Sequence, residues 1–130
     1  MARILLVDDS LYQRIKLRKL LEVAGYEVFE AADGEEGMNL AFSRELDCMM
    51  LDLLMPKVGG MEVLREFQKR HMTLPVIVHT SDIQEQTRQE CFAYGAVAVL
   101  NKPSRDEELL AAISQAIHSQ GKETGNASIT

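Results

Sequence analysis

Residues 48–56, CMMLDLLMP, place one carboxylate, that of Asp52, at the end of an apolar run. The run 48–51 contains no charged residue, which is typical of a strand buried on both faces of a sheet. An unpaired charge in such surroundings costs several kcal/mol or more, so either the strand ends at water or a cation lies beside the carboxylate. The residues that follow the other apolar runs decide between these two arrangements.

Four further strand candidates alternate with stretches that have the apolar spacing of helices. The predicted strands are residues 4–7, 27–31, 48–51, 75–79 and 97–100. The predicted helices are residues 11–24, 35–44, 61–70, 84–94 and 106–118. This alternation predicts an α/β fold, in which helices cover both faces of a parallel sheet. The second strand is the most polar of the five, so we place it nearer an edge.

Local signals mark the ends of the predicted elements. Four residue pairs have, or nearly have, the spacing of a capping box: Ser10 with Gln13, Asp33 with Glu36, Ser81 with Gln84, and Ser104 with Glu107. The predicted inward face of the first helix comprises Leu11, Ile15, Leu20, Leu21 and Ala24. From residue 120 the chain is mostly small and polar, so we predict a domain at residues 1–119 and a flexible polar tail at residues 120–130.

The composition excludes several classes of protein. Hydrophobic residues make up 46% of the chain and charged residues 26%, which is typical of a globular domain. The net charge of -6 argues against direct nucleic-acid binding. No apolar run is long enough for membrane insertion and no secretory signal is present, so we expect a cytoplasmic protein. Cys48 and Cys91 lie in apolar segments, and we expect both to be reduced, buried thiols.

Polar residues follow four of the five predicted strands. They are Asp8 and Asp9 after the first strand, Asp52 after the third, Thr80 and Ser81 after the fourth, and Asn101, Lys102 and Pro103 after the fifth. Because the carboxyl ends of parallel strands meet at one edge of the sheet, we expect these side chains to lie close together. The carboxylate of Asp52 would then have the ammonium group of Lys102 beside it.

This set of groups predicts a particular chemistry. Neighbouring carboxylates raise each other's pKa unless a cation lies among them, and carboxylate oxygens with water are the ligands that Mg²⁺ prefers. A metal ion, an ammonium group and a hydroxyl around one carboxylate form a receptor for a phosphoryl group. An aspartate can itself be the nucleophile and form an acyl phosphate. Taken singly, each residue also suits an ordinary strand end or helix cap.

In their order and spacing, five stretches resemble the response-regulator receiver domain, and in particular the single-domain chemotaxis regulators. They are ILLVDDS (4–10), AADGEEG (31–37), LDLLMPKVGG (51–60), PVIVHTS (75–81) and GAVAVLNKP (95–103). The resemblance extends from Arg3 to about Ser119. It implies a flavodoxin-like, doubly wound fold, with five parallel strands in the order 2-1-3-4-5 and five helices.

The resemblance also implies roles for individual residues. Asp52 corresponds to the phosphoacceptor of the family. Asp8 and Asp9 correspond to the acidic pair that holds Mg²⁺, one directly and one largely through water. The backbone carbonyl of Leu54 corresponds to a third protein ligand, so the implied metal site comprises these three aspartates and that carbonyl.

Two further residues correspond to groups that contact the phosphoryl group in the family. Thr80 corresponds to the switch hydroxyl, which moves toward the phosphoryl group. Lys102 corresponds to the lysine that pairs with a phosphoryl oxygen, and its bond to Pro103 is often cis in the family.

The fifth strand departs from the family pattern. The family usually has Tyr or Phe three residues before the lysine, and that ring swings inward when the switch hydroxyl moves. Here the position is Val99, whose stiff side chain cannot make the same rotation. Val97 and Ala98 are more apolar than the usual pair, so this edge either packs within the sheet or exposes an apolar patch. An exposed patch would suit a partner, or a homodimer through the fourth helix, fifth strand and fifth helix.

Three departures lie near the implied phosphoryl site. Ser81 stands where the family commonly has Ala and adds a hydroxyl near the site. Asp82 lies two residues after the switch threonine. Leu54 places an apolar side chain over the site and should hinder an attacking water, so we expect slow loss of the phosphoryl group.

The leading interpretation is a two-component response regulator. A sensor histidine kinase or a phosphotransfer protein would donate a phosphoryl group to Asp52 with Mg²⁺ as cofactor. The chain would catalyse only its own phosphorylation and dephosphorylation and would not be an enzyme in the usual sense. No output domain follows the receiver in this sequence, so we expect output through contact with a downstream protein or through a domain that lies outside this sequence.

Three other functions fit the residues less well. A phosphatase that uses an aspartyl phosphate typically has a second Asp where this chain has Leu54. A flavin-binding electron carrier needs a phosphate cradle after the first strand, where Asp8 and Asp9 would repel a phosphate. A receiver-like module that docks without using phosphate is disfavoured by the full set of acidic residues and Lys102, although Val99 leaves it open.

Overall fold

A computed structural model describes residues 1–129 of the chain, and the side chains of residues 1–119. Five strands alternate with five helices in this range. The strands are β1 (Arg3–Val7), β2 (Glu27–Ala31), β3 (Cys48–Leu51), β4 (Val76–Thr80) and β5 (Ala98–Asn101). The helices are α1 (Leu11–Val23), α2 (Gly34–Ser43), α3 (Gly60–Lys69), α4 (Glu85–Ala93) and α5 (Asp106–Ile129).

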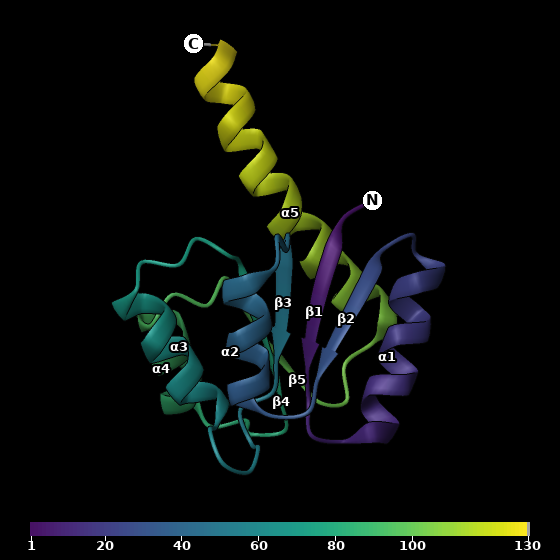
Figure 1. The fold of residues 1–130 in the computed structure, drawn as a ribbon, viewed down its shortest axis with the longest axis vertical. Coiled ribbons are helices and arrows are strands. Elements are labelled where there is room, and N and C mark those ends of the chain that lie inside the picture. Colours follow the sequence, from purple (N-terminus) through teal and green to yellow (C-terminus); the bar gives the residue numbers. More distant parts are fainter. Residues whose placement is uncertain (130) are drawn as a thin grey trace.

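The strands form one parallel sheet in the order β2-β1-β3-β4-β5, which confirms the predicted fold and the predicted edge position of β2. Figure 1 shows the arrows of the labelled strands running toward one edge, with the helices in two groups on either side of the sheet. The register pairs Val7 with both Ala31 and Leu51, so the residues that follow β1 and β3 leave the sheet at the same level.

Two apolar layers lie on the two faces of this sheet, and β3 contributes to both. Met49 and Leu51 pack in the layer under α2, α3 and α4. Cys48 and Met50 pack in the layer under α1 and α5. Because successive side chains of a strand point to opposite faces, a strand covered on both sides needs an unbroken apolar run. The sequence of residues 48–51 therefore follows from the position of β3 in the middle of the sheet.

Two of the four predicted caps are confirmed. Ser10 Oγ accepts a hydrogen bond from Gln13 N at 3.2 Å, and Asp33 Oδ1 accepts one from Glu36 N at 2.9 Å. The Glu36 carboxylate reaches back to the main-chain N–H of Ala32 at 2.7 Å, one residue before the cap. These bonds satisfy N–H groups that have no partner inside the helix.

The predicted caps of α4 and α5 are wrong. The carboxylate of Asp82, not the hydroxyl of Ser81, accepts from Gln84 N at 2.9 Å, because an Asp side chain readily bonds the main chain two residues on. The hydroxyl of Ser104 lies 3.0 Å from Nε2 of His79 and so contacts β4.

The predicted inward face of α1 is also partly wrong. Leu17 and Leu21 are the buried residues of this helix. Leu11 and Ile15 are 61% and 59% exposed, and Ala24 is exposed as well. An apolar pattern fixes the spacing of a stripe along a helix, but the tilt of the helix on the sheet decides which stripe is covered.

The last helix is longer than predicted. We expected the last helix to end at His118, whereas α5 continues to Ile129. The domain boundary at residue 119 stays a prediction. No proline follows residue 103, and helix-favouring residues such as Gln120, Lys122 and Glu123 can continue the helix. Figure 1 shows this distal part leading away from the sheet. Among the described residues, no helix has both the length and the apolar character that crossing a bilayer requires.

Candidate functional site

Two buried aspartates lie next to each other where β1 and β3 end. Asp8 is 2% exposed and its main-chain N–H donates to the carbonyl of Ala31, while Asp52 is 6% exposed and donates to the carbonyl of Val7. Asp9 is exposed. One carboxylate oxygen from each of the three aspartates lies within 4.8 Å of the other two. The sheet therefore brings together the three acidic residues that the sequence predicted would meet.

Lys102 lies against two of these carboxylates. Its Nζ is 2.7 Å from Oδ2 of Asp8 and 3.5 Å from Oδ2 of Asp52. The main-chain N–H of Lys102 donates to the carbonyl of Thr80 at 2.8 Å, which ties the loop after β5 to the end of β4. The peptide bond between Lys102 and Pro103 is cis, as the resemblance implied. The carboxylate of Asp52 thus has a cation beside it.

Lys102 does not fully offset the burial of Asp52. Burial raises the pKa of the Asp52 carboxyl above its usual range; the Lys102 ammonium lowers it and the Asp8 carboxylate raises it again. The carboxylate form of Asp52 is therefore less favourable here than in water. A second cation among the carboxylates would favour that form.

The donor set fits a magnesium ion. The N–H of Ser10 holds Oδ1 of Asp8 at 2.9 Å, and the N–H of Leu54 holds Oδ1 of Asp52 at 3.2 Å, so both carboxylates have fixed orientations. The exposed carboxylate of Asp9 leaves one side open to the water that Mg²⁺ retains. The role implied for the carbonyl of Leu54 stays a prediction.

Thr80 is fully buried at the end of β4, the strand beside β3. Its Oγ1 accepts a hydrogen bond from Asp82 N at 3.1 Å. The Asp82 carboxylate accepts from Gln84 N and from the hydroxyl of Thr87, and the carbonyl of Asp82 accepts from the Asn101 side chain. The hydroxyl of Thr80 is therefore linked to the start of α4 through one residue. Ser81 is exposed, as is Pro103.

The side chain of Val99 is a core group, 8% exposed and packed in the layer under α4. Its carbonyl accepts a hydrogen bond from Nη1 of Arg88 on α4 at 3.2 Å. Val97 is half exposed and Ala98 is partly buried. These two residues line a groove of about 310 Å³, together with residues of α5. At this edge Val99 packs within the core, whereas Val97 exposes an apolar side chain, so each of the two expected arrangements holds for one residue.

Sequence reasoning missed two groups beside the site. The ring of His79 lines a cavity of about 260 Å³ with Lys102 and Ser104. Burial, and next the charge of Lys102, lower the pKa of His79 to about 4. Arg14 donates from Nη1 to the carbonyl of Asp8 at 2.7 Å. No pattern in the sequence separates this arginine from the other basic residues of α1, because only the packing of α1 brings it to β1.

The comparisons with known proteins agree with this geometry. The family model described as "Response regulator receiver domain" matches residues 4–114. The transcriptional regulatory protein CpxR of Escherichia coli is 39% identical over 113 residues, which are 87% of this chain and 48% of CpxR. This chain thus spans about half the length of that relative. Protein PilH of Pseudomonas aeruginosa is 37% identical over 116 residues, covering 88% of this chain and 96% of PilH.

Solved structures give the same result. A CheY-like receiver domain protein of Methanospirillum hungatei superposes with a TM-score of 0.89 at 28% identity, covering 95% of this chain and 98% of that one. The response regulator TrrA of Thermotoga maritima, solved in complex with Mg²⁺ and BeF, superposes with a TM-score of 0.81 at 31% identity, covering 89% of this chain and 99% of that one.

Proposed function

Since the chain belongs to the response regulator receiver domain family, we propose that it is a signalling switch that accepts a phosphoryl group on Asp52. The observation that carries the proposal is the meeting of a buried carboxylate, two further acids and one ammonium group at the carboxyl edge of the sheet. These groups come from three separate loops. A structural ion pair needs only one acid and one base, so the surplus of acid favours a metal-dependent reaction.

In the proposed reaction a carboxylate oxygen of Asp52 attacks phosphorus. A new O–P bond forms, the bond from phosphorus to the donor breaks, and its electron pair leaves with the donor group. Asp8, Asp9 and Asp52 would hold Mg²⁺, which supplies neutralisation of the charge on the transferred group. Lys102 would move from the carboxylates to a phosphoryl oxygen, and the hydroxyl of Thr80 would donate to another.

The proposed donor is a sensor histidine kinase or a phosphotransfer protein, and the proposed compartment is the cytoplasm. The proposed output is contact of a downstream protein with the surface of α4, β5 and α5, where Val97 gives an exposed apolar group. The net charge of -6 disfavours direct contact of this chain with nucleic acid. A homodimer through the same surface is the alternative use of the groove.

One observation favours a second candidate, a module that docks without phosphorylation. The buried Val99 replaces the aromatic group that usually turns inward, so one family route from the site to the surface is missing. In that case partner binding would not change when beryllofluoride, a phosphoryl mimic, is added with Mg²⁺.

Phosphorylation is tested with a small donor. Incubation with acetyl phosphate and Mg²⁺ should add one phosphoryl group by intact-mass measurement, and chelation of the metal should prevent it. Asp52→Asn should abolish the addition. Asp47→Asn is the matched control, because Asp47 is an exposed aspartate at the opposite end of β3. Labelling of Asp52→Asn to the same extent as the unaltered protein would place the reaction elsewhere.

A further inference from the structure

We infer that Arg14 is a positioning residue for the metal site, whose side chain holds the peptide group between Asp8 and Asp9. The inference rests on the magnesium site of the proposed function. It assigns a task to a side chain on α1 that touches neither the metal nor a phosphoryl group.

The main chain at the end of β1 needs a donor that the sheet does not supply. The carbonyl of Val7 is the last on β1 to accept from a neighbouring segment, through Asp52 N. The next carbonyl, that of Asp8, accepts instead from Nη1 of Arg14 at 2.7 Å. The carbonyl of Ser10 accepts from the main-chain N–H of Arg14 at 3.0 Å. The bond to Ser10 is the first main-chain bond of α1, which any residue at position 14 would make. The side chain of Arg14 therefore holds the carbonyl of Asp8, which belongs to the peptide group that joins Asp8 to Asp9.

This placement matters because Asp9 is the least supported of the three acids. The carboxylates of Asp8 and Asp52 are buried and each accepts a main-chain N–H. The carboxylate of Asp9 is exposed, so its direction depends on the main chain that carries it. Fixing the peptide group between Asp8 and Asp9 restricts the orientations in which the Asp9 carboxylate can meet the other two.

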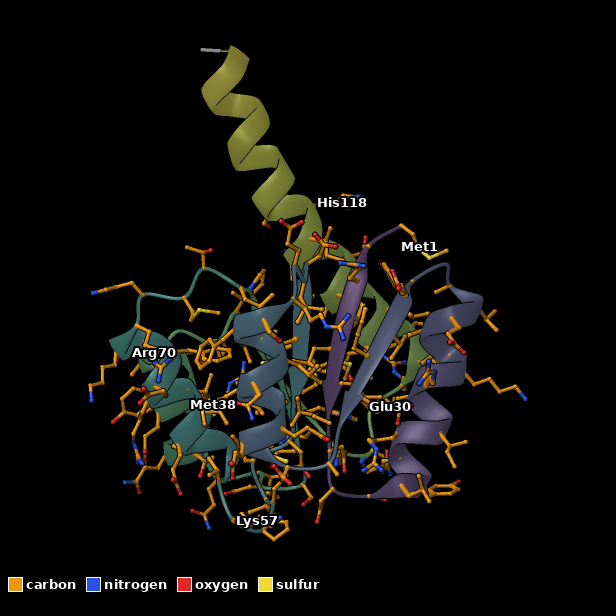
Figure 2. All side chains as sticks on the ribbon, viewed as in Figure 1. Met1, Glu30, Met38, Lys57, Arg70 and His118 are labelled. Atoms are coloured by element: carbon orange, nitrogen blue, oxygen red, sulfur yellow. The ribbon has the colours of Figure 1, made fainter. Side chains whose placement is uncertain are left out.

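The position of Arg14 is in turn fixed by β2. Its Nε is 3.1 Å from Oε1 of Glu30, and the second oxygen of Glu30 lies 2.5 Å from Nη1 of Arg18. Figure 2 shows Glu30 on the side of β2 that faces α1. The planar guanidinium of Arg14 donates to Glu30 and to Asp8 from two different nitrogens, a fixed geometry that the single nitrogen of a lysine does not offer. Arg18 shares Glu30, and its other bond is to Glu22, one turn along α1.

The sign of the effect separates positioning from simple charge. If Arg14 acted only as a nearby positive charge, its removal would strengthen the binding of Mg²⁺ by the three acids. If it orients Asp8 and Asp9, its removal weakens that binding. Arg14→Met keeps the apolar stem and removes the donors. Arg18→Met is the matched control, because it removes an equal positive charge from the same helix and also breaks an ion pair with Glu30.

The test is titration of each protein with MgCl₂ in a calorimeter, with unfolding by urea as a control for the fold. Arg14→Met should weaken Mg²⁺ binding about tenfold, a size typical of losing a group that orients metal ligands. Arg18→Met should leave the affinity unchanged or slightly raised. Equal affinities for the two variants, or tighter binding by Arg14→Met, would overturn the inference.

Two further measurements complete the test. With acetyl phosphate, Arg14→Met should need more Mg²⁺ for half-maximal labelling but reach a similar maximal rate, and an unchanged Mg²⁺ requirement would count against positioning. If Arg14→Met does not fold, Arg14→Lys takes its place and should still bind Mg²⁺ more weakly; unaltered affinity would overturn the inference. Mg²⁺ binding without phosphoryl addition by the unaltered protein would refute the proposed function alone. Failure of that protein to bind Mg²⁺ would refute both.

Discussion

The ammonium group of Lys102 contacts two carboxylates at different distances. The ammonium group lies closer to Asp8 than to Asp52, at 2.7 Å against 3.5 Å. Asp52 therefore keeps a raised pKa despite the neighbouring cation, since burial outweighs the longer contact. A residue of this kind is suited to exchange partners, because a metal ion that takes over the acids would release the ammonium group. The reactivity of the site thus depends on distances within a few side chains.

A pH effect on stability belongs to this scale and arises from His79. Its pKa is lowered to about 4 in the folded protein, first by burial and next by Lys102, from an ordinary value of 6.5. In the unfolded chain His79 is therefore protonated as the pH falls through 6.5, whereas in the folded chain it is protonated only near pH 4. The contribution of His79 to stability is full above that window and is lost as the pH falls through it.

We expect His79 to reduce the free energy of unfolding by about 1 kcal/mol between about pH 7.5 and about pH 5.5. Urea unfolding at both pH values measures this change, and His79→Gln provides the comparison because glutamine does not titrate. The difference in stability between the two proteins should shrink as the pH falls. A difference that stays constant would show that His79 titrates alike in the folded and unfolded chains.

A second prediction at this scale concerns Leu54, which is 58% exposed beside Asp52. Leucine cannot orient an attacking water, whereas an asparagine at this position could hydrogen-bond one. Leu54→Asn should therefore shorten the lifetime of the phosphorylated protein several-fold, as measured by loss of phosphoryl mass after removal of the donor. Val23→Asn, a change at an exposed apolar residue in α1, should leave the lifetime unaltered. An equal lifetime for Leu54→Asn and the unaltered protein would contradict the proposed role.

At the scale of elements, the connection from β3 to α3 leaves no room for a side chain at Gly60. A Cβ on Gly60 would lie 2.3 Å from the carbonyl oxygen of Asp52 and 2.7 Å from Cα of Leu53. Both of those atoms are main chain, so no side chain can move aside. The first residue of α3 is therefore glycine because the helix starts against the main chain of Asp52 and Leu53.

Gly60→Ala should lower the free energy of unfolding by about 2 kcal/mol or more, because the added methyl group displaces main chain. Gly59→Ala is the matched control: its Cβ would meet only the carbonyl oxygen of Leu53, at 3.3 Å, and we expect a loss of no more than about 1 kcal/mol. Thermal or urea unfolding measures both. Similar losses in the two variants would show that the loop can shift to admit the methyl group.

At the scale of the whole molecule, two apolar layers hold the sheet edge that carries the site. The part of α5 whose side chains are described contributes Leu109, Ile113 and Ala116 to one layer. All three precede residue 119, the boundary predicted for the domain. These three residues, with Leu17 and Leu21 of α1, are the described helical residues buried in this layer.

We therefore expect a chain that ends at Ser119 to fold and to be phosphorylated like the full chain. Its free energy of unfolding should differ by less than about 0.5 kcal/mol, since changes outside the packed core are usually within that range. Ile113→Ala, which empties a fully buried position, should by contrast cost about 2–5 kcal/mol. A truncated chain as unstable as Ile113→Ala would show that the domain extends into residues 120–129.

The sequence determined the order of elements, the parallel sheet and the edge at which the acids gather. Apolar runs of four or five residues predict buried strands, and in a parallel sheet all residues that follow such strands share one edge. Asp8, Asp9, Asp52 and Lys102 could be brought together on that basis alone, and the structure places them in contact range.

Only the tertiary structure decided which side of each helix is covered and which neighbour each polar group meets. The exposure of Leu11 and Ile15, the bond from Gln84 N to Asp82 and the bond from Arg14 to Asp8 depend on how helices tilt and loops close. Several side chains within a turn of each position could have made these contacts equally well by spacing. The physical reason is that sequence periodicity constrains distance along one element, whereas packing sets the angle between two.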